Sequence, residues 1–243
     1  MAERVDDLQY KGLRLIQDTD GFCFGVDAVL LAHMAKNTPS QNTIDLCCGN
    51  GIVALLLAGK TDTPHITALE LQHSAADLAR RSVALNGLEE RVEVICGDVK
   101  EVQKQFMRGS FDVVTCNPPY MKNTCGLKNE NEARTIARHE VCCTLEDVVR
   151  AAAYLLRPGG KLFLVHRPER LVDIFTAMRE SKLEPKRMQM VHPSCGKRAN
   201  IVLIESSYMG GRELKLLEPL YVYDEAGNYT KEIDAIYERG YGM

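Results

Sequence analysis

The tetrapeptide Asn117-Pro118-Pro119-Tyr120 combines residue types that could hold and orient a planar amine. Its two prolines fix φ and remove two N–H donors, and Pro118 biases Asn117 toward extended backbone, so the carbonyl and amide oxygens keep set directions. These oxygens could accept hydrogen bonds from both N–H groups of a conjugated amine while the Tyr120 ring stacks beside it. The tetrapeptide therefore predicts a site that aims a weakly nucleophilic lone pair at an electrophile.

Residues 111–116, which precede the tetrapeptide, form an apolar, β-branched run that is typical of a buried strand. Ligands of open α/β sheets bind at the carboxyl ends of the strands, which is where the tetrapeptide would lie. A Pro-Pro loop that merely closes a strand is the structural alternative. A glycine loop upstream in the chain favours the ligand site.

That glycine loop is Gly49-Asn50-Gly51, between an expected strand at residues 43–48 and an expected helix at residues 52–58. Glycines let the chain turn tightly and let a ligand approach the backbone, with the helix N-terminus just behind. Residues 49–54 also match the loose G-x-G-x-x-A pattern of dinucleotide-binding loops. This pattern alone therefore does not exclude a nicotinamide cofactor.

Two carboxylates follow the next two expected strands, at residues 65–69 and 92–96. Glu70, 19 positions after Gly51, stands where a ribose diol is held by charge-assisted hydrogen bonds. Asp98 could accept a hydrogen bond from an adenine amine; an ordinary Gly-Asp turn is the structural alternative, and the position after a strand end favours the ligand role. The pattern places the following polar and glycine positions on one rim of the sheet: Asp45, Gly49, Gly51, Glu70, Asp98 and Asn117.

The remaining elements complete an alternating α/β pattern. We expect two short strands within residues 8–16, and a helix over residues 28–34 with Asp27 as its N-cap. His33 on that helix is expected to be packed or exposed rather than a ligand. Further helices are expected over residues 74–86, 145–156 and 170–181, and further strands over residues 161–165, 187–191 and 199–205.

The composition is that of an ordinary globular protein: 243 residues, 45% hydrophobic and 26% charged. No run approaches the ~18 apolar residues of a membrane helix, and the charged start does not resemble a signal peptide, so we expect a cytoplasmic location. The nine cysteines show no Cys-x-x-Cys spacing, so neither a metal site nor a disulfide framework is expected. The net charge of −3 excludes a uniformly basic protein, but residues 157–198 hold ten Lys and Arg against four acidic residues.

These residues carry a family resemblance. The series Asp45-Leu46-Cys47-Cys48-Gly49-Asn50-Gly51, Glu70, Asp98 and Asn117-Pro118-Pro119-Tyr120 resembles class I S-adenosylmethionine-dependent methyltransferases with an amino-methylating Asn-Pro-Pro-Tyr site. Residues 24–31, 128–140 and 227–230 resemble, more narrowly, the bacterial tRNA1(Val) adenine-N6 methyltransferase family. Cys47 departs from that family, which often has Gly there.

The resemblance implies an α/β fold with a single Rossmann-like, doubly wound, mostly parallel sheet of seven strands. It would form one methyltransferase domain over residues 1–243, with an N-terminal strand and helix extension (1–36), a catalytic core (42–205) and a tail (206–243). S-adenosylmethionine would be the cofactor. The implied cofactor-binding residues are Phe24, Gly25, Asp27, Asp45, Cys47, Gly49, Gly51, Glu70, Leu71, Asp98, Val99 and Asn117. The implied catalytic residues are Asn117, Pro118, Pro119 and Tyr120.

The same resemblance implies tRNA as the partner, with Tyr120 stacking on the target base. Residues 121–140 would form a lid whose substrate contacts are Lys122, Lys128, Arg138 and His139; a solvated loop is the alternative. The basic stretch 192–198 could touch RNA or be a solvated turn. The five tyrosines at 221, 223, 229, 237 and 241 could stack bases, but we favour a C-terminal helix packed on the core.

The predicted function is therefore formation of N6-methyladenosine in a tRNA anticodon loop, where an adenine is easily extruded and where RNA sequence is read. Alternatives are a glutamine side chain of a release factor, a DNA adenine, or a catalytically silent RNA-binding module. Release-factor enzymes of this type look to carry a helical N-terminal substrate domain, for which we expect too little chain here. A nicotinamide oxidoreductase would need a second phosphate-binding half, which we do not find.

Overall fold

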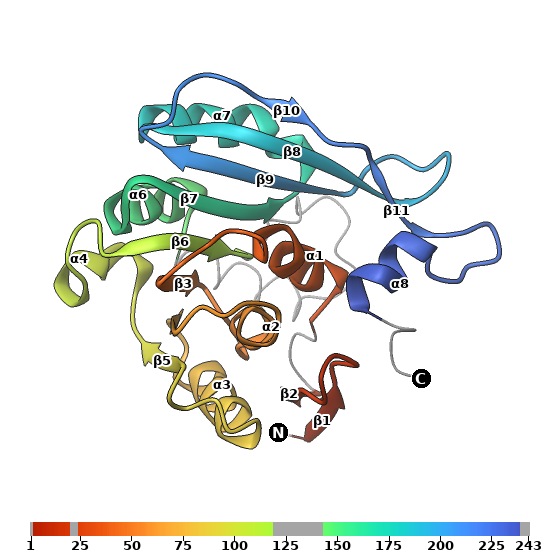
Figure 1. The fold of residues 1–243 in the computed structure, drawn as a ribbon, viewed down its shortest axis with the longest axis horizontal. Coiled ribbons are helices and arrows are strands. Elements are labelled where there is room, and N and C mark those ends of the chain that lie inside the picture. Colours follow the sequence, from red (N-terminus) through yellow and green to blue (C-terminus); the bar gives the residue numbers. More distant parts are fainter. Residues whose placement is uncertain (1, 20–23, 119–142, 239–243) are drawn as a thin grey trace, which may run out of the picture.

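The fold is organised around one large, mostly parallel sheet (Figure 1). The computed structural model describes residues 2–19, 24–118 and 143–238. Seven strands run in the order β8-β9-β7-β6-β3-β4-β5, and among them only β9 is antiparallel to its neighbours. Their bounds are β3 Asn42–Leu46, β4 His65–Glu70, β5 Val92–Cys96, β6 Phe111–Cys116, β7 Leu156–His166, β8 Leu183–Ser194 and β9 Ile201–Tyr208. The predicted α/β class and mostly parallel sheet are confirmed.

The tail adds two short strands, so the described sheet has nine strands rather than the predicted seven. Both β10 (Lys215–Leu216) and β11 (Leu220–Tyr223) pair in parallel with β8, which would otherwise be an open edge. The helix expected in the tail is present as α8 (Lys231–Tyr237), which packs against α1 (Val26–Ala35) and β11. The sequence predicted the helix of the tail but not these two strands, because pairing with a strand that is distant in the sequence leaves no local pattern.

Helices cover both faces of the sheet, because the strands present apolar side chains alternately to either side. On β6, for example, Val113 packs into one buried cluster and Val114 into the other. The first cluster includes α1 and α2 (Ile52–Lys60), with α3 (His73–Leu85) at its edge. The second includes α4 (Val102–Gln105), α6 (Leu145–Leu155) and α7 (Leu171–Glu180). Short 3-10 helices occur at η1 (Val99–Glu101) and η2 (Pro168–Arg170).

Several predicted strand boundaries are wrong; β8, for example, spans Leu183–Ser194 rather than residues 187–191. The N-terminal strands are β1 (Glu3–Asp7) and β2 (Arg14–Asp18), which form their own antiparallel pair, and most of residues 8–16 is the turn between them. Leu8, Tyr10 and Leu13 are buried in the core from that turn, so an apolar alternation that suggested strands instead anchors a loop. β7 begins at Leu156 rather than at residue 161, because its first residues continue the pairing with β6 past a bulge.

Among the residues that the structure describes, no helix has the length and apolar character needed to cross a membrane.

Asp112 joins the amino ends of the central strands. Its Oδ2 accepts hydrogen bonds from the backbone N–H of Gln41 (2.6 Å) and of Asn42 (3.0 Å), and its Oδ1 lies 2.5 Å from Arg157 Nε. The side chain is buried, so these partners replace the water that it loses. One carboxylate thus ties β3 to β6 and to the start of β7.

We predict that Asp112→Ala lowers the free energy of unfolding by about 2 kcal/mol, because two partly buried N–H groups lose their acceptor. Urea unfolding followed by circular dichroism measures this change. Asp62→Ala, at an exposed carboxylate, is the matched control and should change stability by less than about 0.5 kcal/mol. Equal small effects in both variants would contradict a structural role for Asp112.

Candidate active site

The carboxyl ends of four neighbouring strands meet at one rim of the sheet. In the strand register Leu46 lies opposite both Leu69 and Cys116, and Leu69 lies opposite Ile95. The residues that follow these positions therefore gather at that rim. They include Cys47, Gly49, Glu70, Asp98 and Asn117, as the sequence predicted, and Leu71 and Val99 lie beside them, exposed and buried respectively.

Glu70 holds the glycine loop in place. Its Oε2 accepts a hydrogen bond from the Gly49 N–H (2.9 Å), and its Oε1 accepts one from the Gln72 N–H (2.9 Å). A Cβ atom added at Gly49 would meet no atom within 4 Å, so the space in front of the loop is open. At Gly51, with φ of 86°, an added Cβ would lie 3.1 Å from the Ala79 Cβ, so the side away from the rim is closed by α3. The glycine loop thus packs against α3 at Gly51 and leaves open space at Gly49.

The helix α2 begins directly after this loop without a side-chain cap. The N–H groups of a first helical turn have no partner within the helix and carry a partial positive charge. Together with the open space at Gly49, they form a place where a carboxylate or phosphate could bind.

Asp45 is a buried carboxyl group with one oxygen lacking a partner. Its Oδ1 accepts a hydrogen bond from Thr115 Oγ1 (2.7 Å), and its Oδ2 has no hydrogen-bond partner among the described residues. Burial, with a smaller contribution from the Glu70 charge, raises the pKa of Asp45 to about 7. A buried acceptor of this kind is suited to a cationic or N–H-bearing group of a ligand. Thr115 was missed by the sequence analysis, which treated it as a strand residue only.

The segment before α1 is linked to the glycine loop by Gln17. This buried side chain, on β2, accepts hydrogen bonds at Oε1 from the Phe24 N–H (3.0 Å) and from Asn50 Nδ2 (3.4 Å). The sequence analysis did not identify Gln17. The available signal was its uncharged polar side chain among apolar residues of β2.

The prediction that Asp27 is an N-cap is wrong. The N-cap of α1 is Gly25, and Asp27 lies inside the first turn, buried, with its Oδ1 accepting from the Ala28 N–H (2.9 Å). A Cβ at residue 25 would lie 2.9 Å from Asp27 Oδ1, so a side chain there would displace that carboxylate. The Asp27 carboxylate thus lies beside the start of α1 but does not cap the helix.

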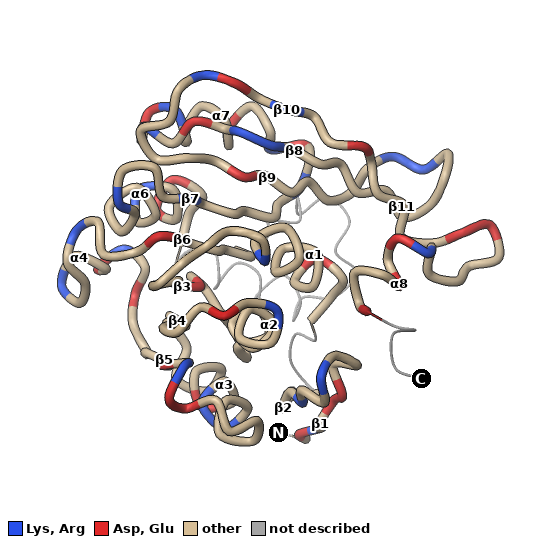
Figure 2. The backbone as a smooth tube through the Cα atoms, in the orientation of Figure 1, with Lys and Arg blue, Asp and Glu red and all other residues tan. Residues whose placement is uncertain are grey.

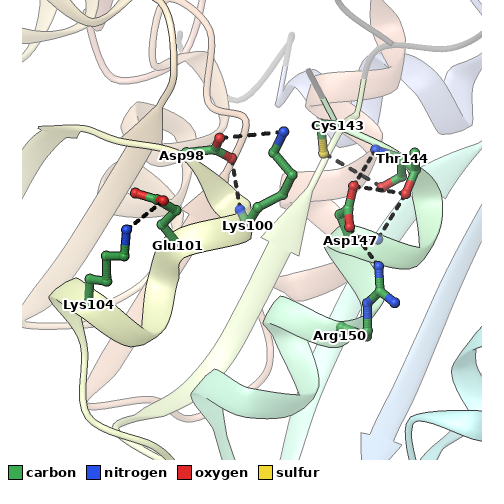
Figure 3. A network of polar contacts seen from close by, with 8 residues as sticks. All are labelled: Asp98, Lys100, Glu101, Lys104, Cys143, Thr144, Asp147 and Arg150. Carbon is green, nitrogen blue, oxygen red and sulfur yellow. Dashed lines mark hydrogen bonds and ion pairs between the residues drawn. The ribbon is translucent and has the colours of Figure 1, made fainter. Parts of the chain in front are cut away.

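Asp98 serves locally as the cap of η1. One of its oxygens accepts from the Lys100 N–H (2.8 Å), and the other lies 3.6 Å from Lys100 Nζ. Figure 3 shows this pair facing the start of α6, where Thr144 and Asp147 form a capping box. Asp98 thus takes part in its own turn, and its carboxylate remains partly exposed on the rim.

Three thiols line the base of the rim. Cys47 lies close enough to Cys116, at the end of β6, and to Cys143, just before α6, for their thiols to shift one another's pKa. The contact with Cys116 raises the pKa of Cys47 well above its usual value, and burial adds to this shift. Burial also raises the pKa of Cys116.

The six cysteines among the described residues are free, and no group of three or more His, Cys, Asp or Glu there is arranged to hold a metal ion. The proximity of Cys116 and Cys143 to Cys47 was not foreseen, because it arises from long-range packing.

The reactive turn follows Cys116 directly. Asn117 is half-buried and Pro118 is buried, both at the end of β6 between β3 and β7. The other predicted residues of this turn and lid lie outside the described residues: Pro119, Tyr120, Lys122, Lys128, Arg138 and His139.

The comparisons with known proteins find similarity to methyltransferases. The model of the family "Methyltransferase small domain" matches residues 25–182. A tRNA1(Val) (adenine(37)-N6)-methyltransferase of Porphyromonas gingivalis is 30% identical over 70% of this chain and 68% of its own length. One of Bacteroides fragilis is 28% identical over 92% and 94%. The crystal structure of a predicted O-methyltransferase from Agrobacterium tumefaciens superposes with a TM-score of 0.71 at 25% identity, covering 87% of this chain and 95% of that one.

The backbone at Cys47 yields a stability prediction. Its φ of 57° lies in the left-handed region, which costs a non-glycine residue about 1 kcal/mol. We predict that Cys47→Gly is about 1 kcal/mol more stable than Cys47→Ala, since both lack the thiol and only the backbone preference differs. Chemical denaturation measures the two variants. At Cys96, whose φ is not positive, the order of the same two variants should be reversed; the same order at both sites would contradict the strain at Cys47.

The raised pKa of Asp45 predicts a pH dependence. Between about pH 4 and pH 7 the folded protein holds a proton at Asp45 that the unfolded chain has released, so stability falls as pH rises through this window and is constant above it. Asp45→Asn should remove this component of the slope. Unfolding free energies of both proteins, measured without added cofactor at about pH 5 and about pH 7.5, test it. Identical slopes would show that Asp45 titrates normally.

Proposed function

This chain belongs to the methyltransferase small domain family, and from that premise we propose that it transfers a methyl group from S-adenosylmethionine to N6 of an adenine in a tRNA anticodon loop. The observation that carries the proposal is the register of β3 and β6, which sets Asn117 and Pro118 beside the glycine loop. The relatives that cover most of this chain act, by their names, on adenine 37 of tRNA1(Val).

The residues on the rim fit the cofactor. The first turn of α2 and the open space at Gly49 would hold its carboxylate, and the unpartnered Oδ2 of Asp45 lies where a cationic group would be stabilised. Each carboxylate oxygen of Glu70 accepts one hydrogen bond and retains a lone pair for a ribose hydroxyl. Asp98 would accept from the adenine amine. When bound, the cofactor supplies an electrophilic methyl group on a positively charged sulfur.

The chain's own contribution to the reaction is orientation. The Asn117 side-chain oxygen and the Pro118 carbonyl would accept the two N–H bonds of the target amine, which turns its lone pair toward the cofactor side of the rim. Buried Cys116 and Pro118 keep water away from this position. The methylated nitrogen loses its proton readily, so the mechanism needs no strong base.

The wider assignments follow from the same proposal. Tyr120 would stack on the target base, and Lys122, Lys128, Arg138 and His139 would contact the RNA. A tRNA substrate supports a cytoplasmic location. We also propose that residues 1–243 form one methyltransferase domain, because the tail strands β10 and β11 extend the catalytic sheet.

We predict that Asn117→Ala lowers kcat for tRNA methylation by about a hundredfold or more, with cofactor affinity little changed, because a positioning acceptor is lost. The measurement is methyl transfer from labelled S-adenosylmethionine to unmodified total tRNA, with nucleoside mass spectrometry for N6-methyladenosine. Asn37→Ala, the same change at an exposed residue, is the control.

Two outcomes would contradict the proposal in different ways. Full activity in Asn117→Ala would remove the reactive turn from the mechanism. Methylation of release-factor glutamine or of DNA, with none in tRNA, would retain the enzyme and replace its substrate.

A further inference from the structure

A second concave surface lies in the C-terminal part of the chain, outside the candidate active site. It is a groove with a volume of about 610 Å³, between the hairpin at residues 194–198 and the turn at residues 224–228. We call it the tail groove. Its lining residues are Pro193, Ser194, Lys197, Arg198, Tyr223, Asp224, Glu225 and Gly227.

The tail groove opens at the same rim as the reactive turn. β8 is parallel to β7, since both are antiparallel to β9, and β11 is parallel to β8. The carboxyl ends of β6, β7, β8 and β11 therefore lie along one edge, as Figure 1 shows. β8 is three strands from β6, which corresponds to about 14 Å across the sheet. Met188 is the β8 residue level with Cys116, and the hairpin begins six residues beyond it, about 20 Å further along the strand. A single-stranded nucleic acid with one base at Asn117 would therefore have nucleotides several positions along its chain within reach of the groove.

Two cations at the groove have no side-chain partner within the part of the chain that the structure describes. Lys197 and Arg198 are exposed, and no side-chain hydrogen bond or salt bridge of either occurs among the described residues. The hairpin that presents them is ordered by the His192 Nδ1–H, which donates to the Lys197 carbonyl (2.8 Å), and by the Lys197 N–H, which donates to the Ser194 carbonyl (3.1 Å). Figure 2 shows this basic stretch beyond the ends of β8 and β9.

The opposite wall carries two exposed carboxylates, Asp224 and Glu225. Asp224 Oδ1 accepts hydrogen bonds from the Ala226 and Asn228 N–H groups (2.9 Å each), which ties this side chain to its own turn. Neither carboxylate pairs with Lys197 or Arg198 among the described residues, so both cations are available to a bound anion.

A rigid aromatic platform stands beside these cations. Tyr223 stacks on Tyr229 (centroids 5.3 Å apart, planes at 12°), which in turn stacks on Tyr237 in α8 (5.6 Å, 19°). Tyr223, at the open end of this ladder, is 42% exposed. The aromatic tail thus packs α8, as the sequence favoured, and still presents a tyrosine to solvent at the groove.

We propose that the tail groove binds an unpaired segment of the RNA substrate, with phosphates at Lys197 and Arg198 and a base stacked on Tyr223. Phosphate contacts position a nucleic acid, and stacking on aromatic side chains binds its unpaired bases. The choice of RNA as the ligand of the groove rests on the proposed function. It assigns a docking surface separate from the residues that hold the cofactor and the target amine.

The test is binding of fluorescent, unmodified tRNA to the full chain, measured by anisotropy and independent of turnover. Lys197→Gln/Arg198→Gln should weaken binding about tenfold at about 0.1 M salt, and should reduce the slope of log K against log salt by about 1.4, for two phosphate contacts. The control Lys182→Gln/Arg212→Gln removes the same charge from exposed residues at the opposite ends of β8 and β9, and should change affinity less than about twofold.

A second variant pair tests the stacking. Tyr223→Ala should weaken binding about fivefold or more, whereas Tyr223→Phe, which keeps the ring, should not. S-adenosylmethionine affinity and the melting temperature of each variant show whether the fold and cofactor site are intact. Wild-type affinity in Lys197→Gln/Arg198→Gln, or an equal loss in the charge control, would overturn the tail groove as a docking surface.

The outcome also separates this inference from the proposed function. RNA binding that depends on the tail groove, without N6 methylation of any tRNA, would keep the groove and reject the activity. N6 methylation with a KM for tRNA that is unchanged in both groove variants would keep the activity and reject the groove.

Discussion

The parallel pairing of β3 with β4 and β6 is the constraint on which the rest of the structure depends. These strands are buried on both faces, so polar groups that serve a ligand can stand only at or beyond their ends. Among the buried polar residues inside β3 and β6, Asp45 and Thr115 lie toward the carboxyl ends of their strands, and Thr115 Oγ1 donates a hydrogen bond to Asp45 Oδ1. Because parallel strands end at the same edge, residues that are far apart in sequence, such as Gly49 and Asn117, become neighbours.

Local patterns were sufficient for the elements that surround the site. Short apolar runs predicted β4, β5 and β6 almost to the residue, and the glycines at 49 and 51 located the start of α2. Predictions failed where the outcome depends on distant residues. The apolar residues around Tyr10 belong to a loop that packs into the core. The N-cap of α1 is Gly25 and not Asp27. Two strands of the tail pair with the edge strand β8. None of these contacts leaves a periodicity that sequence alone can show.

Cys47 illustrates how sequence and structure divide the information. The family that the sequence resembles often has glycine at this position, and glycine is the residue that tolerates a positive φ. The structure shows that Cys47 keeps the left-handed backbone and places its thiol between Cys116 and Cys143. The backbone cost is therefore accompanied by packing that a glycine could not provide.

The same thiols bear on the chemistry of the rim. A thiolate beside a sulfonium would compete with the target amine for the methyl group, since the thiolate rather than the thiol is the nucleophile. The contact with Cys116 and burial raise the pKa of Cys47, burial raises that of Cys116, and the contact with Cys47 and burial raise that of Cys143, so all three remain neutral thiols. Asp45, by contrast, has a pKa of about 7 without a cation nearby, and a positively charged ligand would favour its ionised form. The electrostatics of the site thus suit a cationic methyl donor while suppressing the protein's own nucleophiles.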